Sequence, residues 1–148
     1  MKSILTALLA LCFGVAAHAA TLEGTIELKF SDSHFSKDNF KKEFGEVVKA
    51  TCNWHVGTFF DEETIFAGIK VKNSGGKPMF FNYYVAFYDK DKKLVGAVGQ
   101  RSFGNAGLKP GEEDEVGPCM IHLPKGRYKD VVSFQAVIYE TDEAPRKG

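Results

Sequence analysis

Apolar and polar residues alternate along most of the chain after residue 24, with the two-residue period of strands that bury one face. Short polar breaks separate the alternating runs, at 61–63, 89–92 and 110–111. The pattern predicts about seven strands, within or through the segments 25–30, 51–60, 64–73, 81–88, 93–99, 119–123 and 128–140. Short strands at this spacing favour an antiparallel, Ig-like β-sandwich in a mainly β protein.

One segment has a different period. Phe40, Phe44, Val47 and Val48 are spaced as on the apolar stripe of a helix. A serine or aspartate at 36 or 38 could cap its start. We therefore expect one short N-terminal helix before the second strand.

The first nineteen residues have the layout of a secretory signal peptide. Lys2 is followed by the uncharged run ILTALLALCFGVAA, and Ala17 and Ala19 stand at the −3 and −1 positions of a cleavage site. The apolar run is too short for a lasting membrane span, and no longer one follows. We expect a signal peptide at 1–19 and a single domain at 20–148, periplasmic or secreted and without a membrane span after cleavage. An uncleaved anchor is the alternative.

The charge and the cysteine content of the chain limit the classes of function that the protein can have. The chain has 19 basic and 19 acidic side chains and a formal net charge of zero, without a basic stripe. This composition argues against nucleic-acid binding. Cys52 and Cys119 remain after cleavage, and two cysteines in an oxidising compartment most simply form one disulfide. The alternative is a redox-active pair, which is usually close in sequence.

The run FNYYVAFY, residues 81–88, is apolar on both faces of its strand. Tyr84 and Tyr88 lie on the strand face opposite the one that carries Phe81 and Phe87. Tyr139 likewise lies on the face of the last strand opposite its expected core face. Tyrosine suits interfaces, so these three residues are candidates for binding a protein or cell-envelope component. The alternative is that other parts of the fold cover them.

Two segments of the sequence are candidate metal sites. Asp89 and Asp91 resemble the start of a calcium loop. However, Lys93 stands at position five, where a third oxygen ligand is required, and Leu94 at position six, where a glycine is required. Met120 and His122 share a strand face and suit copper, although two ligands are too few without a third. We expect no cofactor, and keep periplasmic copper binding as the alternative function.

No pattern for nucleophilic catalysis is present in the sequence. There is no G-x-S-x-G motif. No acidic or nucleophilic residue stands at a sequence spacing typical of a catalytic site from His34, His55 or His122. The acidic run EEDE at 112–115 is typical of a solvated turn. We therefore expect no enzymatic activity.

The segment VKNSGGKPMFFNYYVAFYDKDKKLVG followed by LKPGEEDEV resembles bacterial extracytoplasmic modules of the FxLYD type. The likeness covers about residues 68–140, with Phe87-Tyr88-Asp89 as the Tyr-Asp element and 108–112 as the LxPGE element. It departs at Asp91-Lys92, where the family has Asp-Gly. The resemblance implies an Ig-like sandwich without a common active site, and hence an exported, non-enzymatic binding or accessory module.

Overall fold

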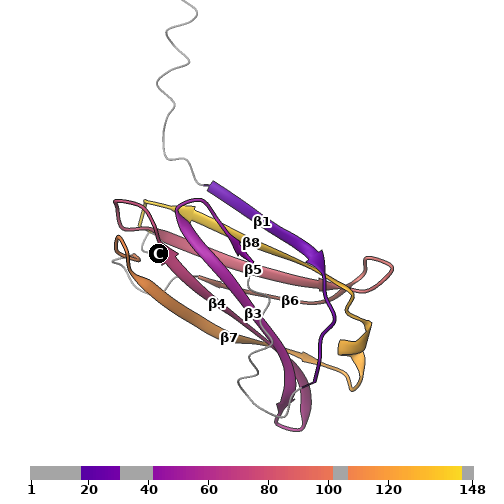
Figure 1. Cartoon of the computed structure of the whole chain (residues 1–148). Coiled ribbons are helices and arrows are strands. Elements are labelled where there is room, and N and C mark those ends of the chain that lie inside the picture. The colour runs from indigo at the N-terminus through magenta and orange to yellow at the C-terminus, as the bar shows by residue number, and fades with distance from the viewer. Residues whose placement is uncertain (1–17, 31–41, 102–106, 145–148) are drawn as a thin grey trace, which may run out of the picture.

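The computed structural model describes residues 18–30, 42–101 and 107–144, which form two packed antiparallel sheets (Figure 1). One sheet has the strand order β1-β8-β5-β6 and the other β2-β3-β4-β7. The strands are β1 (His18–Thr25), β2 (Glu43–Phe44), β3 (Val48–Phe59), β4 (Glu62–Asn73), β5 (Phe80–Tyr88), β6 (Leu94–Arg101), β7 (Glu113–Leu123) and β8 (Ser133–Thr141). A single 3₁₀ turn, Arg127–Asp130, precedes β8.

This architecture confirms the predicted antiparallel β-sandwich. The core lies between the sheets and is filled by the inward residues of each alternating run. On β5, Tyr83, Val85 and Phe87 are almost completely buried, as their shared face predicts. Trp54 of β3 packs against Phe87 and Phe134, which belong to the other sheet, with ring centroids 5.5 and 4.4 Å apart.

The predicted helix is not seen in the described residues. Its first part, up to residue 41, lies outside them, and the remainder forms β2, a bend and the start of β3. Gly45 explains this, since its φ of 98° is incompatible with a helix. A β-carbon there would also lie 2.1 Å from the carbonyl oxygen of Val48.

The first strand begins earlier than predicted. The alternating segment 25–30 is mostly outside regular structure, and β1 ends at Thr25. Ile26 donates its N–H to Val132 beside one sheet, and Phe30 forms an isolated bridge with Val56 of the other. The segment therefore crosses between the sheets while Leu28 points into the core. The expected cleavage point, after Ala19, falls two residues inside β1.

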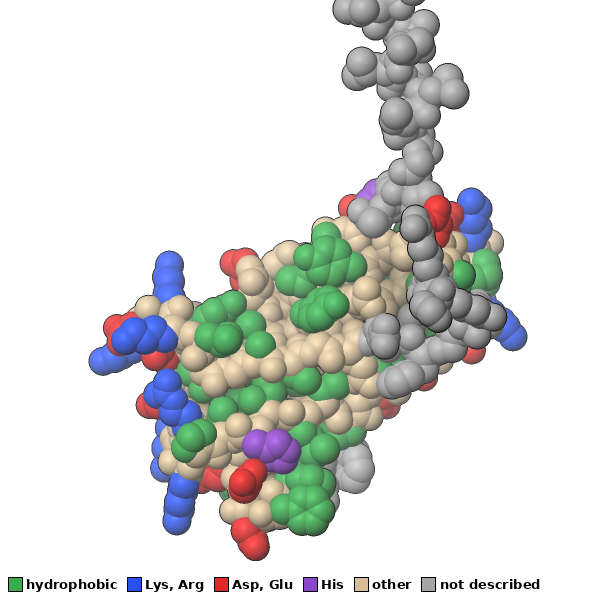
Figure 2. All heavy atoms as spheres, turned by 180° about the vertical axis from the view of Figure 1, so that it is seen from behind, with side chains coloured by type: hydrophobic (Ala, Val, Ile, Leu, Met, Phe, Trp, Pro, Cys, Tyr) green, Lys and Arg blue, Asp and Glu red, His purple; other side chains and the backbone are tan. Residues whose placement is uncertain are grey.

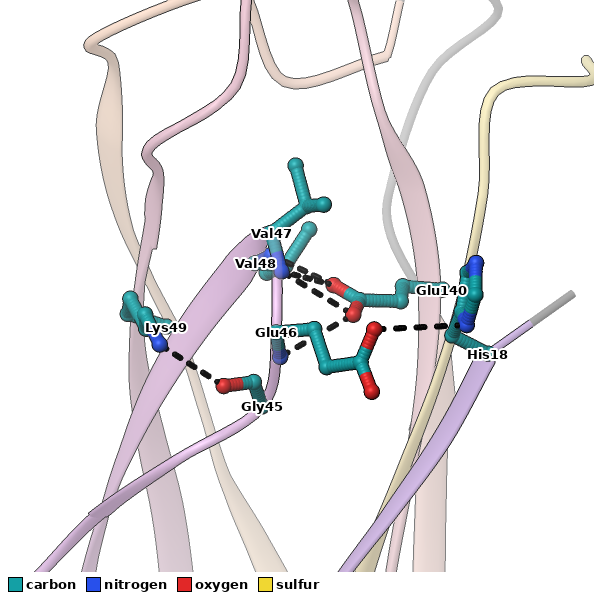
Figure 3. A network of polar contacts seen from close by, with 7 residues as sticks. All are labelled: His18, Gly45, Glu46, Val47, Val48, Lys49 and Glu140. Carbon is teal, nitrogen blue, oxygen red and sulfur yellow. Dashed lines mark hydrogen bonds and ion pairs between the residues drawn. The ribbon is translucent and has the colours of Figure 1, made fainter. Parts of the chain in front are cut away.

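A buried carboxylate joins the two sheets (Figure 3). Glu140 of β8 is 1% exposed, and it accepts backbone N–H groups from Glu46, Val47 and Val48 at the start of β3. The bonds from Glu46 and Val47 measure 3.0–3.2 Å. Three converging N–H groups replace the hydration that the carboxylate loses on burial. Glu140 therefore fixes the β2–β3 bend against the opposite sheet.

Within the described residues, no helix is both long and apolar enough to span a membrane.

Candidate functional site

Tyr84 and Tyr139 form an exposed aromatic pair on the outer face of the β1-β8-β5-β6 sheet. They belong to the neighbouring strands β5 and β8, and their ring centroids are 6.0 Å apart at an interplanar angle of 78°. Tyr84 is 48% exposed and Tyr139 47%. The sequence thus placed both side chains on the correct face, and the structure brings them together.

Gly99 of β6 lets Tyr84 lie down over the sheet. The two residues are directly opposite in the β5–β6 ladder, and a β-carbon at position 99 would lie 2.4 Å from Cδ1 of Tyr84. The ring therefore occupies the space of the missing side chain, an arrangement that shields a strand glycine. One side of the ring contacts the sheet, and much of the ring remains accessible to solvent.

A shallow hollow of about 270 Å³ continues the aromatic pair toward β6. Its walls are almost entirely apolar or small: Tyr84, Val85, Ala86, Ala97, Val98, Gly99, Gln135 and Val137. Tyr88, the third candidate, is half-buried and lies in a separate hollow with Glu23 and Lys92. Gln135 lines both hollows, so all three tyrosines belong to one outer face.

Figure 2 shows hydrophobic side chains exposed in separate groups on one broad face of the molecule. Lysine and arginine side chains gather mainly toward the ends in the same view.

The predicted Cys52–Cys119 disulfide is absent, and both residues are free thiols. Cys52 is on β3 and Cys119 on β7, with β4 between them. Two strand spacings separate their Cα atoms by about 9 Å or more, beyond the roughly 7 Å limit for a disulfide. The sequence placed both cysteines on strands but could not show that another strand separates them.

Cys52 instead ends a buried chain of hydrogen bonds. Nε1–H of Trp54 donates to the hydroxyl oxygen of Tyr83 at 3.2 Å, and the Tyr83 hydroxyl bonds to the Cys52 thiol. Burial raises the pKa of Cys52 from its ordinary 9.0 to about 12, although the Tyr83 bond works against this rise. Burial also raises the pKa of Tyr83 well above its usual value. These groups are neutral near pH 7, which suits a structural role.

Thiol labelling should distinguish the two cysteines. Cys119 is partly exposed, with its thiol bonded to Gln100, and burial raises its pKa less than that of Cys52. We expect iodoacetamide near pH 8 to modify Cys119 slowly in the folded protein and Cys52 only after unfolding, because the thiolate is the reactive form. Peptide mass spectrometry measures both sites, and a pair that resists labelling until a reductant is added would contradict the structure.

The same pKa shifts predict loss of stability at alkaline pH. Above pH 9 the unfolded chain releases the Cys52 proton while the folded chain retains it up to about pH 12. The unfolded state then binds fewer protons, so the free energy of unfolding falls as pH rises. Urea denaturation between pH 8 and 11 should show this fall, and Cys52→Ala should make it shallower. An unchanged pH dependence in that variant would contradict the assignment.

Three histidines lie at separate places in the described residues. Nδ1 of His18 is 3.3 Å from a carboxylate oxygen of Glu46. His55 stacks on Phe66 with ring centroids 4.8 Å apart. Nδ1 of His122 lies 3.1 Å from the Thr64 hydroxyl and 3.4 Å from Glu62. The sequence showed no acidic or hydroxyl partner for His122, and the pairing of β4 with β7 brings these two side chains to it.

The two candidate metal patterns lie in a turn and on a strand. Asp89 accepts N–H groups from Asp91 and Lys93 and so closes the β5–β6 turn. Met120 and His122 are exposed on one face of β7, and Phe66 lies opposite Met120 on β4. Among the described residues, no three His, Cys, Asp or Glu side chains gather as a metal site. Copper binding stays a prediction with two candidate ligands.

The comparisons with known proteins assign the chain to no family. No family model matches the chain, and no curated protein matches it. Among solved structures, the enzymatically active domain of tailspike protein 4 from bacteriophage CBA120 is similar at 8% identity and a TM-score of 0.25. That match covers 84% of this chain, and the chain spans only 17% of the phage protein. The likeness to FxLYD-type modules stays a prediction.

Proposed function

We propose that the protein is an exported, non-enzymatic binding module of the bacterial cell envelope. Its binding surface is the outer face of the β1-β8-β5-β6 sheet, centred on Tyr84 and Tyr139. The proposal combines the leader-like first nineteen residues with a domain in which two exposed tyrosines lie together on one sheet. The partner is a protein or another envelope component.

The half-exposed aromatic pair is the observation that carries this proposal. A tyrosine has two side-chain torsions, so it offers a large contact area at a small cost in conformational entropy. Tyr84 is further restrained because its ring lies against Gly99. The hollow beside it is apolar, and its backbone belongs to rigid strands. Such a surface can bind a partner with little rearrangement.

Co-sedimentation of the purified protein with isolated envelope fractions tests this function. We expect the double variant Tyr84→Ser, Tyr139→Ser to weaken binding by about tenfold or more, because buried tyrosines often dominate interfaces. Met120→Ser is the matched control, since Met120 is 40% exposed on the other sheet. Equal binding by the double variant and the wild type would contradict the proposed surface.

Gly99→Ala provides a more selective test of the same surface. The added methyl group would displace the Tyr84 ring, which is exposed and free to turn away. We expect little change in the free energy of unfolding, but weaker envelope binding than in the wild type. Near-ultraviolet circular dichroism should report the altered tyrosine environment. Unchanged binding together with a displaced ring would show that the ring position is irrelevant.

A further inference from the structure

His122 of β7 is held by two groups of the neighbouring strand β4, and both of them meet the same ring nitrogen. Nδ1 lies 3.1 Å from the hydroxyl oxygen of Thr64 and 3.4 Å from a carboxylate oxygen of Glu62. The Thr64 hydroxyl donates its own proton to the backbone carbonyl oxygen of Glu62, at 3.3 Å. Both groups therefore act as acceptors at Nδ1, so Nδ1 carries the proton of the neutral imidazole. The lone pair of the ring is then on Nε2.

The imidazole is fixed on one side and open on the other. Thr64 lies directly opposite His122 in the β4–β7 ladder and is completely buried, so its hydroxyl has a fixed position. The His122 side chain is 45% exposed, and within the described part of the chain its polar contacts all use Nδ1. Proteins orient a metal-binding histidine in this way, with an acceptor on the ring nitrogen that does not bind the metal.

Met120 supplies a second donor on the same face of β7. It stands two residues before His122, so the two Cα atoms are about 7 Å apart and both side chains point outward. Met120 is 40% exposed, and its three flexible torsions allow the thioether sulfur to approach the imidazole. Phe66 lies opposite Met120 on β4 and is almost completely buried, which makes the sheet beside this sulfur apolar.

The two donors select a soft monovalent ion. A thioether sulfur and an imidazole nitrogen suit Cu(I), whereas Ca²⁺ and Mg²⁺ prefer oxygen ligands. Zn²⁺ usually takes four ligands, and the described residues contain no group of three His, Cys, Asp or Glu side chains that could hold a metal.

The charge around His122 also suits a cation. Imidazole and thioether bind a metal without losing a proton, so the bound ion keeps its single positive charge. Asp61, Glu62 and Glu63 line the hollow that His122 borders, together with one lysine, Lys125. The surplus of carboxylates stabilises a positive charge there.

We propose that Met120 and His122 bind one Cu(I) ion on the outer face of the β2-β3-β4-β7 sheet, through Sδ and Nε2. Thr64 and Glu62 are positioning residues, since they orient the imidazole from its other nitrogen. The site is on the sheet opposite the one that carries Tyr84 and Tyr139, and it does not depend on the proposed envelope binding.

Nitrogen-15 NMR of the histidine rings tests the donors directly, with Ag(I) as the redox-inert analogue of Cu(I). Every sample carries Cys119→Ser, because this partly exposed thiol would also bind a soft ion. Without metal, we expect the proton of the neutral His122 ring on Nδ1. One equivalent of Ag(I) should then shift Nε2 of His122 together with the methyl carbon of Met120. A proton on Nε2, or shifts confined to other histidines, would overturn the proposal.

Competition for Cu(I) with bicinchoninate, in the absence of oxygen, measures the affinity of variants in the same background. Thr64→Val should lower the affinity roughly tenfold, because the outer partners of a metal ligand contribute about that much. Its metal-free spectrum should also show part of the His122 population with the proton on Nε2, which a merely structural role would not produce. Met120→Leu and His122→Gln should each lower the affinity further. Glu62→Ala, at an exposed side chain, replaces Thr64→Val if circular dichroism shows that variant to be unfolded.

Met79→Leu is the matched control for Met120→Leu. Met79 lines a different hollow, together with His18, and is only 7% exposed. We expect its replacement to leave the Cu(I) affinity unchanged. An equal loss in Met79→Leu and Met120→Leu would contradict the assigned site, and so would an unchanged affinity in Met120→Leu or in a folded positioning variant.

Discussion

Glu140→Ala is expected to lower the free energy of unfolding by about 3–5 kcal/mol, since it leaves three backbone N–H groups without their carboxylate. Those groups belong to Glu46, Val47 and Val48, and the last of the three bonds is buried. Because the carboxylate and the Val48 N–H are buried, water replaces the lost acceptor less readily here than at an exposed ion pair. Urea denaturation followed by the fluorescence of Trp54, the only tryptophan, provides the measurement.

Glu46→Ala is the matched control for Glu140→Ala. Its carboxylate belongs to the same region but is exposed, where it contacts His18 at 3.3 Å (Figure 3). Exposed ion pairs contribute little, so the control should unfold at nearly the wild-type urea concentration. Comparable losses of stability in both variants, or no loss in Glu140→Ala, would show that the buried carboxylate does not join the sheets.

Trp54→Ala should also destabilise the fold by about 3–5 kcal/mol, because it opens a cavity between the two sheets. The indole contacts Phe87 and Phe134 of the opposite sheet and donates a hydrogen bond to Tyr83. Trp54→Phe keeps an aromatic ring but loses the N–H donor, so its free energy of unfolding should fall clearly less than that of Trp54→Ala. Urea denaturation monitored by far-ultraviolet circular dichroism measures both variants. Equal losses would mean that the hydrogen bond, rather than packing, dominates.

Most of the strands from β3 to β8 could be predicted because their alternation and turns agree. The exception is the first half of β7, since the acidic run that was expected to be a turn lies in this strand from Glu113 onward. Tyr83, Val85 and Phe87 face the core while Tyr84 faces outward, as a period of two requires. The polar breaks predicted at 61–63 and 89–92 lie at or next to the observed turns, and the buried face then fixes the registers of the flanking strands. The outward position of Tyr84 and Tyr139 followed from the same pattern, but their mutual contact required knowledge that β5 and β8 are neighbours.

The features that sequence reasoning missed depend on strand order or on backbone conformation. The predicted Cys52–Cys119 disulfide is wrong because β4 lies between the two strands that carry these cysteines. The predicted helix is not seen in the described residues because Gly45 adopts a positive φ. Glu140 did leave a signal, since it continues the inward series of Phe134, Ala136 and Ile138. An acid in phase with the core face indicates a buried carboxylate with fixed partners, although the sequence does not identify those partners.

The outer face of the β1-β8-β5-β6 sheet is the proposed binding surface. Site-specific photo-cross-linking in intact cells tests it most directly, with p-benzoylphenylalanine in place of Tyr84 and, as control, in place of Met120 on the opposite sheet. We predict cross-links to an envelope partner from position 84 and few from position 120. Partner cross-links mainly from position 120, or equally from both positions, would contradict the account.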